Sequence, residues 1–306
     1  MKTCILFPGQ GAQAIGMGKD LYDAHKKVRE LFEQASDITN MGLADLIFSG
    51  TEDDLKQTKN TQVALALVDY ATAVVLHDMG FSFQGTAGFS LGEWPALVEA
   101  DVLTFESMMK LVAERGRLMD EAGKRSGGST MSAVLSLEPE KIEEALKQAG
   151  INDVWVANFN APNQSVISGT ETGITKAEEV IKAVGARRVV RLKVSGAFHS
   201  PIMRYAYDGF KEVLQDVEFK NPQIAFYSNV TGGKVMSGEE LKKLAADQII
   251  SPVRWTQEEQ AMLDDGYERF VEAGPGSVLC GLWKSFNAEI PAYPCSTLEL
   301  IQKLPQ

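Results

Sequence analysis

Short apolar segments typical of buried strands alternate with longer segments of helical periodicity along most of this chain, which restricts it to an α/β fold. The first strand is predicted at residues 3–7 and stops at Pro8 and Gly9, where a glycine-rich loop begins. The next segments are predicted in the order helix, helix, strand, helix and helix, at residues 21–38, 62–79, 85–89, 91–100 and 105–122.

A glycine- and serine-rich stretch at residues 123–129 interrupts this pattern, and we place a domain boundary there. The order then becomes strand, helix, strand, strand, helix and strand, at residues 131–137, 139–149, 153–158, 165–168, 173–184 and 188–194. This βαββαβ order is ferredoxin-like. Because helices and strands alternate again after residue 194, at residues 201–217, 224–227, 239–249, 256–265 and 269–272, we predict an inserted subdomain at residues 127–194. The larger α/β domain then comprises residues 1–126 and 195–306.

Composition and charge exclude several classes of protein. Of 306 residues, 44% are hydrophobic and 23% charged, as in ordinary globular proteins, and no stretch of about 18 residues is both apolar and uncharged. We therefore expect no membrane span. The apolar run at the start is too short for a signal peptide, so we expect a cytoplasmic protein. A net charge of −11 without a basic, aromatic-rich stretch argues against nucleic-acid binding.

Three cysteines and three histidines are scattered along the chain. The cysteines, Cys4, Cys280 and Cys295, are an odd number with no close pair, which is typical of structural thiols in a reducing compartment. Neither the cysteines nor the histidines have the spacing of metal ligands. We therefore predict no metal site.

The pentapeptide Gly88-Phe89-Ser90-Leu91-Gly92 lies between a predicted strand and a predicted helix. A G-x-S-x-G motif in this context is typical of a nucleophile elbow, in which the glycines permit a sharp turn that exposes the serine hydroxyl. The start of the following helix offers free N–H groups to a developing oxyanion. Ser90 is therefore the candidate nucleophile; the alternative is that it only caps the helix.

A serine nucleophile needs a base, and His25, His77 and His199 are the three histidines. His25 lies within a predicted amphipathic helix and His77 near a helix end, so both are expected to be ordinary surface residues. His199 follows a β-rich run and precedes Ser200-Pro201, where a new helix is predicted. A loop at such a junction can bring the imidazole to Ser90; the alternative is an unrelated loop histidine. No acidic residue between them has a distinctive setting, which favours a dyad over a triad.

Arg115 precedes Gly116 inside a predicted helix. Glycine there costs about 1 kcal/mol relative to alanine, which indicates close packing or a ligand. An arginine that reached the site would hold a substrate carboxylate by two parallel hydrogen bonds. The alternative is that Arg115 and Arg117 are solvated surface charges.

Three separated segments together resemble the malonyl-CoA:acyl carrier protein transacylases. They are Phe7-Pro8-Gly9-Gln10-Gly11-Ala12-Gln13, Gly88-Phe89-Ser90-Leu91-Gly92-Glu93 and Val194-Ser195-Gly196-Ala197-Phe198-His199-Ser200. Shorter similar segments lie at residues 60–62, 115–116, 158–169, 248–255 and 272–276, so the resemblance covers essentially the whole chain. It implies a hydrolase-like α/β domain with an inserted ferredoxin-like subdomain.

The resemblance assigns a role to each site residue. It implies that Ser90 is acylated, that His199 is its general base, and that the backbone carbonyl of Gln248 orients the imidazole. Arg115 would bind the free malonyl carboxylate. The backbone N–H groups of Gln10 and Leu91 would bind the oxyanion. The residues that would contact the substrate are Gln62, Met119 and Phe198.

The implied reaction transfers malonyl from malonyl-CoA to the phosphopantetheine thiol of acyl carrier protein, in fatty acid synthesis, through a malonyl-serine ester. The implied partners are these two substrates, with no cofactor beyond the thioester itself, and we expect a monomer. Three alternatives stay open: a trans-acting acyltransferase of a polyketide pathway, a serine thioesterase, and a silent scaffold that binds carrier proteins. Two positions depart from the family pattern, since Phe89 stands where histidine is usual and Val63 where proline is usual.

Two further expectations concern selectivity and docking. The bulky Phe198 should narrow the acyl pocket and disfavour an α-methyl branch by about 1–3 kcal/mol, so that malonyl is preferred over methylmalonyl. A basic segment borders the proposed site and consists of Arg187, Arg188, Arg191 and Lys193. It is either a docking patch for an acidic carrier protein or one solvated face of a strand.

Overall fold

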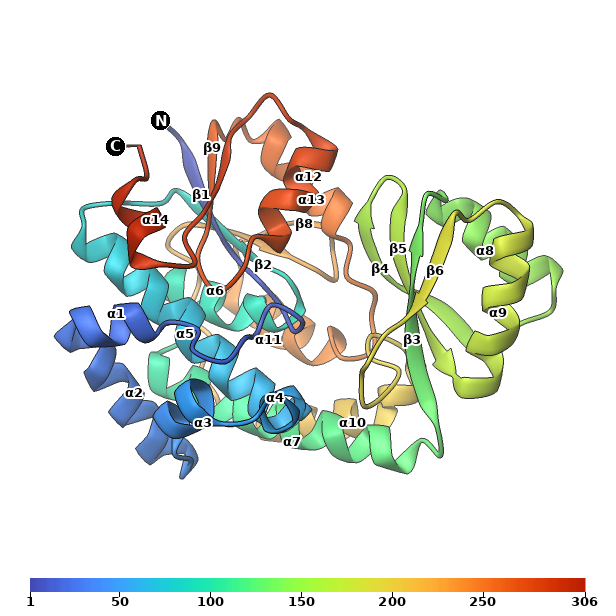
Figure 1. Ribbon diagram of the computed structural model, residues 1–306, viewed down its shortest axis with the longest axis horizontal. Helices are drawn as coiled ribbons and strands as arrows, with labels where there is room; N and C mark the ends of the chain where they lie inside the picture. The colour runs from blue at the N-terminus through green and yellow to red at the C-terminus, as the bar shows by residue number, and fades with distance from the viewer. Residues whose placement is uncertain (306) are drawn as a thin grey trace.

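The structure is a computed structural model that describes residues 1–305, and it contains two β-sheets (Figure 1). The larger sheet has six strands in the order β10-β9-β1-β2-β7-β8. Neighbouring strands are parallel except for the antiparallel pair β7 and β8. In chain order the strands are β1 (Thr3–Phe7), β2 (Gly85–Gly88), β7 (Ala225–Ser228), β8 (Gly233–Val235), β9 (Arg269–Glu272) and β10 (Ala292–Pro294).

Helices surround this sheet, and the long helices α5 and α7 pack against each other beside it (Figure 1). The first group comprises α1 (Lys19–Ala24), α2 (Lys26–Thr39), α3 (Leu43–Ser49), α4 (Glu52–Lys56), α5 (Thr58–Asp78), α6 (Glu93–Glu99) and α7 (Phe105–Arg125). The second comprises α10 (Arg204–Val213), α11 (Gly238–Asp247), α12 (Trp255–Asp264), α13 (Val278–Phe286) and α14 (Leu298–Gln302). Two 3₁₀ turns, η1 (Ser90–Gly92) and η2 (Pro201–Met203), precede α6 and α10.

The smaller sheet is antiparallel, with strands in the order β4-β5-β3-β6. It is built from β3 (Ser129–Leu135), α8 (Pro139–Gln148), β4 (Val154–Ala161), β5 (Gln164–Thr170), α9 (Glu171–Ala183) and β6 (Arg188–Arg191). Both helices lie on one face of this sheet, away from the larger sheet (Figure 1). The predicted βαββαβ order is thus confirmed, and the opposite face of the small sheet is left to meet the rest of the molecule.

Two sequence predictions need correction. The single helix predicted at residues 21–38 is two helices, because His25 has an extended backbone (φ −116°, ψ 122°) that separates α1 from α2. The segment predicted as a linker at residues 123–129 is partly helical, since α7 continues to Arg125 and β3 begins at Ser129. The glycine-rich turn between them is therefore short.

Apolar burial accounts for the main elements. All five side chains of β1 are buried, as are most of those of α5. This continuous burial is the pattern of a parallel strand covered on both faces. The small sheet has a separate apolar core against α8 and α9 that includes Val134, Ile167 and Ile174. Within the described residues no helix combines the length and the hydropathy that crossing a membrane requires.

Candidate active site

The G-x-S-x-G segment forms a tight turn directly after β2. Ser90 has a left-handed backbone (φ 51°), a conformation that costs a non-glycine residue about 1–3 kcal/mol. The two arms of the turn touch, because a Cβ at Gly88 would lie 1.9 Å from the carbonyl oxygen of Gly92. A Cβ at Gly92 would in turn lie 2.1 Å from the oxygen of Phe7. The two glycines are therefore required by close approach, as the motif predicts.

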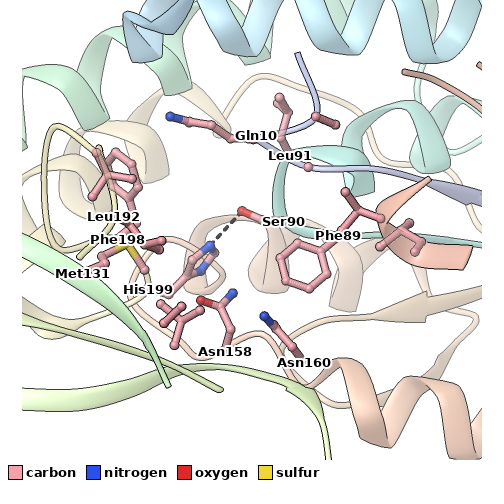
Figure 2. A pocket seen from close by; sticks show the side chains of 18 of the residues that line it. Gln10, Phe89, Ser90, Leu91, Met131, Asn158, Asn160, Leu192, Phe198 and His199 are labelled. Atoms are coloured by element: carbon pink, nitrogen blue, oxygen red, sulfur yellow. Dashed lines mark hydrogen bonds between the residues drawn. The ribbon is translucent and has the colours of Figure 1, made fainter. Parts of the chain in front are cut away.

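The structure brings His199 to Ser90, although 109 residues separate them in sequence (Figure 2). The Ser90 Oγ and His199 Nε2 atoms are 2.7 Å apart. On the other side of the ring, Nδ1 lies 2.9 Å from the backbone oxygen of Gln248 and 3.1 Å from that of Ser251. Because carbonyl oxygens only accept, Nδ1 carries the proton and Nε2 is free to accept one from Ser90.

Burial keeps this histidine neutral. His199 is 5% exposed, and burial, followed by the nearby charge of Arg115, lowers the pKa of its imidazole to about 4. The ring is therefore in its basic form at neutral pH. The other two histidines lie elsewhere: His25 stands between α1 and α2, and His77 pairs with Glu99 at 2.9 Å.

Arg115 is buried behind the serine rather than solvated, with 1% of its surface exposed. Its Nη1 donates to Gln62 Oε1 (2.8 Å), and its Nη2 donates to Gln248 Oε1 (2.7 Å) and lies 3.5 Å from Ser90 Oγ. Burial lowers the pKa of Arg115 to about 10, so the guanidinium stays charged at neutral pH. All these acceptors are neutral oxygens. The cation is thus available to a carboxylate that enters from the cavity.

Close packing of α7 against α5 positions Arg115 beside the serine. A Cβ at Gly116 would lie 3.0 Å from the Cα of Lys59 on α5, so this glycine marks close helix packing. Gln62, also on α5, donates from Nε2 to the Met119 sulfur at 3.3 Å. Arg117, by contrast, is the surface charge, because it pairs with Glu114 and Glu121.

A cavity of about 320 Å³ opens at Ser90 between the two sheets. Its lining includes every residue predicted to contact substrate or oxyanion, namely Gln10, Gln62, Leu91, Arg115, Met119 and Phe198. Figure 2 shows Gln10 and Leu91 on one side of Ser90 and His199 on the other. Gln10 and Leu91 therefore both border the cavity at the nucleophile, and their role at an oxyanion stays a prediction.

The small sheet supplies the opposite wall of the cavity. Met131, Asn158 and Asn160 project into it from β3 and β4, and Leu192 follows β6 (Figure 2). Asn160 is 9% exposed, and its Oδ1 atom has no hydrogen-bond partner within residues 1–305. Phe89 lies at the same side and contacts Trp255, with ring centroids 5.5 Å apart. The wall is therefore apolar with a few amide groups.

Sequence reasoning missed a buried polar network beneath the elbow. Asn229 follows β7 and accepts a hydrogen bond from the Ser90 N–H (2.7 Å). Glu93 and Glu258 contact the same asparagine, and Gln248 Nε2 donates to Glu93. The one available signal was that Asn229 closely follows a strand predicted at residues 224–227, in the same larger α/β domain as the strand predicted at residues 85–89.

The basic segment divides into two kinds of residue. Arg187, Arg188 and Lys193 are exposed. Arg191 instead donates from Nε to Glu178 (2.8 Å) and also pairs with Glu171. Of the four basic residues, Arg191 is therefore already paired with two carboxylates of α9, and the other three face solvent.

A serine at the carboxyl end of the parallel strand β2 and a neutral histidine in the loop between β6 and η2, beside an amide-lined cavity, define the class of serine enzymes that act on acyl groups. The sequence matches the acyl transferase domain family over residues 4–298. It is 37% identical to a malonyl CoA-acyl carrier protein transacylase of Bacillus subtilis (strain 168) over 304 residues, which covers 98% of this chain and 95% of the relative. A relative of the same description from Staphylococcus aureus (strain MRSA252) is 37% identical over 300 residues, covering 97% and 96%.

Comparison with solved structures points to the same family. An acyl carrier protein S-malonyltransferase of Vibrio cholerae O1 superposes with a TM-score of 0.95 at 36% identity, with all of both chains covered. A malonyl-transacylase solved in complex with its type II PKS acyl-carrier protein gives a TM-score of 0.94 at 34% identity, covering 99% of this chain and 98% of that one. The chain therefore belongs to the acyl transferase domain family and, within it, to the malonyl CoA-acyl carrier protein transacylases.

Proposed function

We propose that this protein transfers malonyl from malonyl-CoA to the phosphopantetheine thiol of acyl carrier protein through an ester on Ser90. The observation that carries the substrate assignment is Arg115, a buried cation whose hydrogen-bond acceptors are all neutral and whose Nη2 lies 3.5 Å from Ser90 Oγ. Within the described residues no carboxylate hydrogen-bonds to Arg115, and the buried Glu93 acts on it only through its charge, so a free carboxylate on the acyl chain would be its direct anionic partner. Malonyl carries such a carboxylate and acetyl does not.

In the first half-reaction the Ser90 oxygen attacks the thioester carbonyl while its proton moves to His199 Nε2, 2.7 Å away. The backbone N–H groups of Gln10 and Leu91 stabilise the oxyanion of the tetrahedral intermediate. The C–S bond then breaks, and the coenzyme A thiolate takes the proton from the imidazolium. The products are malonyl-Ser90 and free coenzyme A.

The second half-reaction reverses these roles. The carrier thiol gives its proton to His199 and attacks the malonyl-serine carbonyl, and Ser90 leaves as an alcohol by taking that proton back. Two backbone carbonyls, of Gln248 and Ser251, hold the imidazole orientation that a triad carboxylate would otherwise fix. Arg115 holds the acyl chain through its carboxylate and so directs the thiol rather than water.

We further propose the finer architecture that this function uses. The large domain is hydrolase-like and comprises residues 1–126 and 195–306. Residues 127–194 form an inserted ferredoxin-like subdomain, which the strand order β4-β5-β3-β6 supports. One copy of the chain supplies every site residue, so a monomer suffices for this chemistry, and the cysteine usage supports a reducing, cytoplasmic setting.

The second candidate is the same chemistry on a polyketide carrier protein. It is favoured by one comparison, the malonyl-transacylase solved with its type II PKS acyl-carrier protein. A serine thioesterase is disfavoured because hydrolysis of an uncharged acyl chain gives Arg115 nothing to bind. Product analysis with each type of carrier separates these candidates.

The test is the intact mass of the purified protein after brief exposure to malonyl-CoA, with Ser90→Ala alongside. We expect an adduct of about 86 Da on the wild type and none on the variant, as a covalent intermediate requires. Accumulation of free malonate without an adduct would indicate the thioesterase. Neither adduct nor turnover would indicate the scaffold.

A further inference from the structure

The turn that presents Ser90 is held from below by one side chain, that of Asn229. Its Oδ1 accepts the Ser90 N–H at 2.7 Å, and its Nδ2 donates to the carbonyl oxygen of Gly88 at 2.8 Å. One carboxamide therefore bonds to residues on both sides of Phe89. Among side chains, only Asn and Gln offer a neutral donor and acceptor in this fork.

Asn229 is itself fixed on every side and is 0% exposed. Its backbone N–H donates to Glu93 Oε1 (2.7 Å), and its Nδ2 also donates to Glu258 Oε1 (2.8 Å). Its backbone oxygen accepts the N–H of Arg254 (3.0 Å). These partners lie on α6 and α12 or next to α12, so the asparagine ties the elbow to two helices and to the end of β7.

The bond to Ser90 also determines which N–H group faces the substrate. Within the turn the Gly92 N–H donates to Phe89 and the Glu93 N–H donates to Leu91 and Ser90. Asn229 occupies the Ser90 N–H. The N–H of Leu91 is then the donor that the elbow presents to the cavity, and its direction depends on the left-handed Ser90 backbone that Asn229 holds.

We propose that Asn229 is a positioning residue that fixes the elbow so that the Ser90 hydroxyl and the Leu91 N–H are aligned for acyl transfer. It acts on the rate of ester formation and not on substrate affinity, because it has no contact with the cavity or with Arg115. This inference rests on the proposed function in taking Ser90 as the nucleophile.

The test compares Asn229→Ala and Asn229→Asp with wild type by rapid-quench measurement of malonyl-enzyme formation. Asn229→Asp keeps the volume and an acceptor for the Ser90 N–H, but it loses the amide donor to Gly88 and Glu258 and brings a third carboxyl group next to Glu93 and Glu258. For Asn229→Ala we expect the rate constant of ester formation to fall about 10²-fold, the scale of a small misplacement of reacting groups. The fraction of enzyme that becomes acylated and the KM for malonyl-CoA should stay near wild type, and Asn229→Asp should be slowed as well.

A matched control is Tyr267→Phe, which removes the partly buried hydrogen bond from Tyr267 Oη to the backbone oxygen of Gln84 (3.0 Å), at the opposite end of β2. We expect this variant to keep the wild-type rate constant. If the Asn229 variants show a reduced acylated fraction with an unchanged rate constant, the role is only structural and the proposal is wrong. Wild-type rate constants in both Asn229 variants overturn it equally.

A second probe separates this inference from the proposed function. A fluorophosphonate reacts with an activated serine whatever the natural acyl donor. Slow fluorophosphonate labelling of both Asn229 variants, with normal labelling of Tyr267→Phe, supports the positioning role even if the wild type forms no malonyl adduct. In that case only the assignment of malonyl-CoA as the acyl donor is wrong.

Discussion

The two sheets contribute different kinds of group to one cavity. The large sheet, together with the helices and loops around it, supplies Ser90, His199 and Arg115. Each of these residues is held by hydrogen bonds to buried partners from other elements. The small sheet and the segment after it supply apolar and amide side chains such as Met131, Asn160 and Leu192. Chemistry therefore depends on a connected network, whereas the shape of the cavity depends on separate side chains. Substitutions on the first side should reduce turnover, and those on the second should alter selectivity or affinity.

The largest effect is expected for His199→Ala. Loss of the general base should reduce malonyl transfer about 10³-fold, within the range of general-base contributions, because Nε2 is the acceptor 2.7 Å from Ser90 Oγ. His77→Ala is the matched control, since it removes a histidine that pairs with Glu99 away from the cavity. Steady-state transfer assays check both. Near-wild-type turnover of His199→Ala would mean that another group accepts the serine proton.

Arg115→Ala should have the next largest effect. Malonyl transfer should fall about 10²-fold, as expected when one partner of a buried charge pair is removed, while transfer of acetyl should hold or rise. Arg117→Ala is the control, because Arg117 is an exposed neighbour on the same helix. The measurement is kcat/KM for malonyl-CoA and acetyl-CoA. A variant that kept malonyl transfer and gained none on uncharged thioesters would refute the carboxylate site.

Phe198 lies where the two sides of the cavity meet, so it should change selectivity more than turnover. The ring is 6% exposed and lines the cavity beside His199. Wild type should prefer malonyl-CoA over methylmalonyl-CoA by about 10–200-fold, the value of one methyl in a hydrophobic pocket. Phe198→Ala should narrow this preference with kcat for malonyl changed little. Equal rates for the two substrates in the wild type would overturn this role of Phe198.

The pH profile tests whether the histidine is buried during catalysis. Its pKa is lowered to about 4, so the basic form persists as pH falls from 8 to 5. We expect kcat/KM to change less than about twofold over this range, whereas an ordinary histidine of pKa about 6.5 would lose about 30-fold by pH 5. Arg115→Gln should move the acid limb upward, because the charge of Arg115 is the second cause of the lowered pKa. Glu93 also titrates near this range, because burial raises its pKa to about 7, so a tenfold fall in kcat/KM between pH 7 and 5 that persists in Glu93→Gln would contradict the buried state of His199.

Sequence patterns predicted the parts of this site that have local signatures. Ser90 stands in a strand-to-helix turn after β2, as its motif predicts, and His199 stands in a loop between a strand and a helix. The strand before His199 is β6 of the small antiparallel sheet, however, so the two residues do not meet because they share the edge of one parallel sheet. The βαββαβ order of elements follows equally from local periodicity. The backbone break at His25 escaped prediction because neither glycine nor proline marks it.

The supporting network had no local signature. Asn229 is 139 residues from Ser90, and a single asparagine after a strand resembles any loop residue. Glu258 lies on a helix where a carboxylate is expected to face water, yet it is 0% exposed. Burial raises the pKa of Glu258 well above its usual range. Such groups become visible only when tertiary packing surrounds them.

The smallest effect is expected at the basic segment. There Arg191 is paired with two carboxylates, whereas Arg187 and Arg188 are exposed. Arg187 and Arg188 are exposed, so their replacement by Glu should raise the KM for an acidic carrier protein about threefold to tenfold at low salt, with kcat unchanged. This effect should fade as the ionic strength approaches about 0.2 M. Arg191→Glu should instead lower Tm by a few degrees, because the new carboxylate would face Glu171 and Glu178. If the KM for the carrier is the same at all salt concentrations in Arg187→Glu and Arg188→Glu, these residues form a solvated face and docking occurs elsewhere.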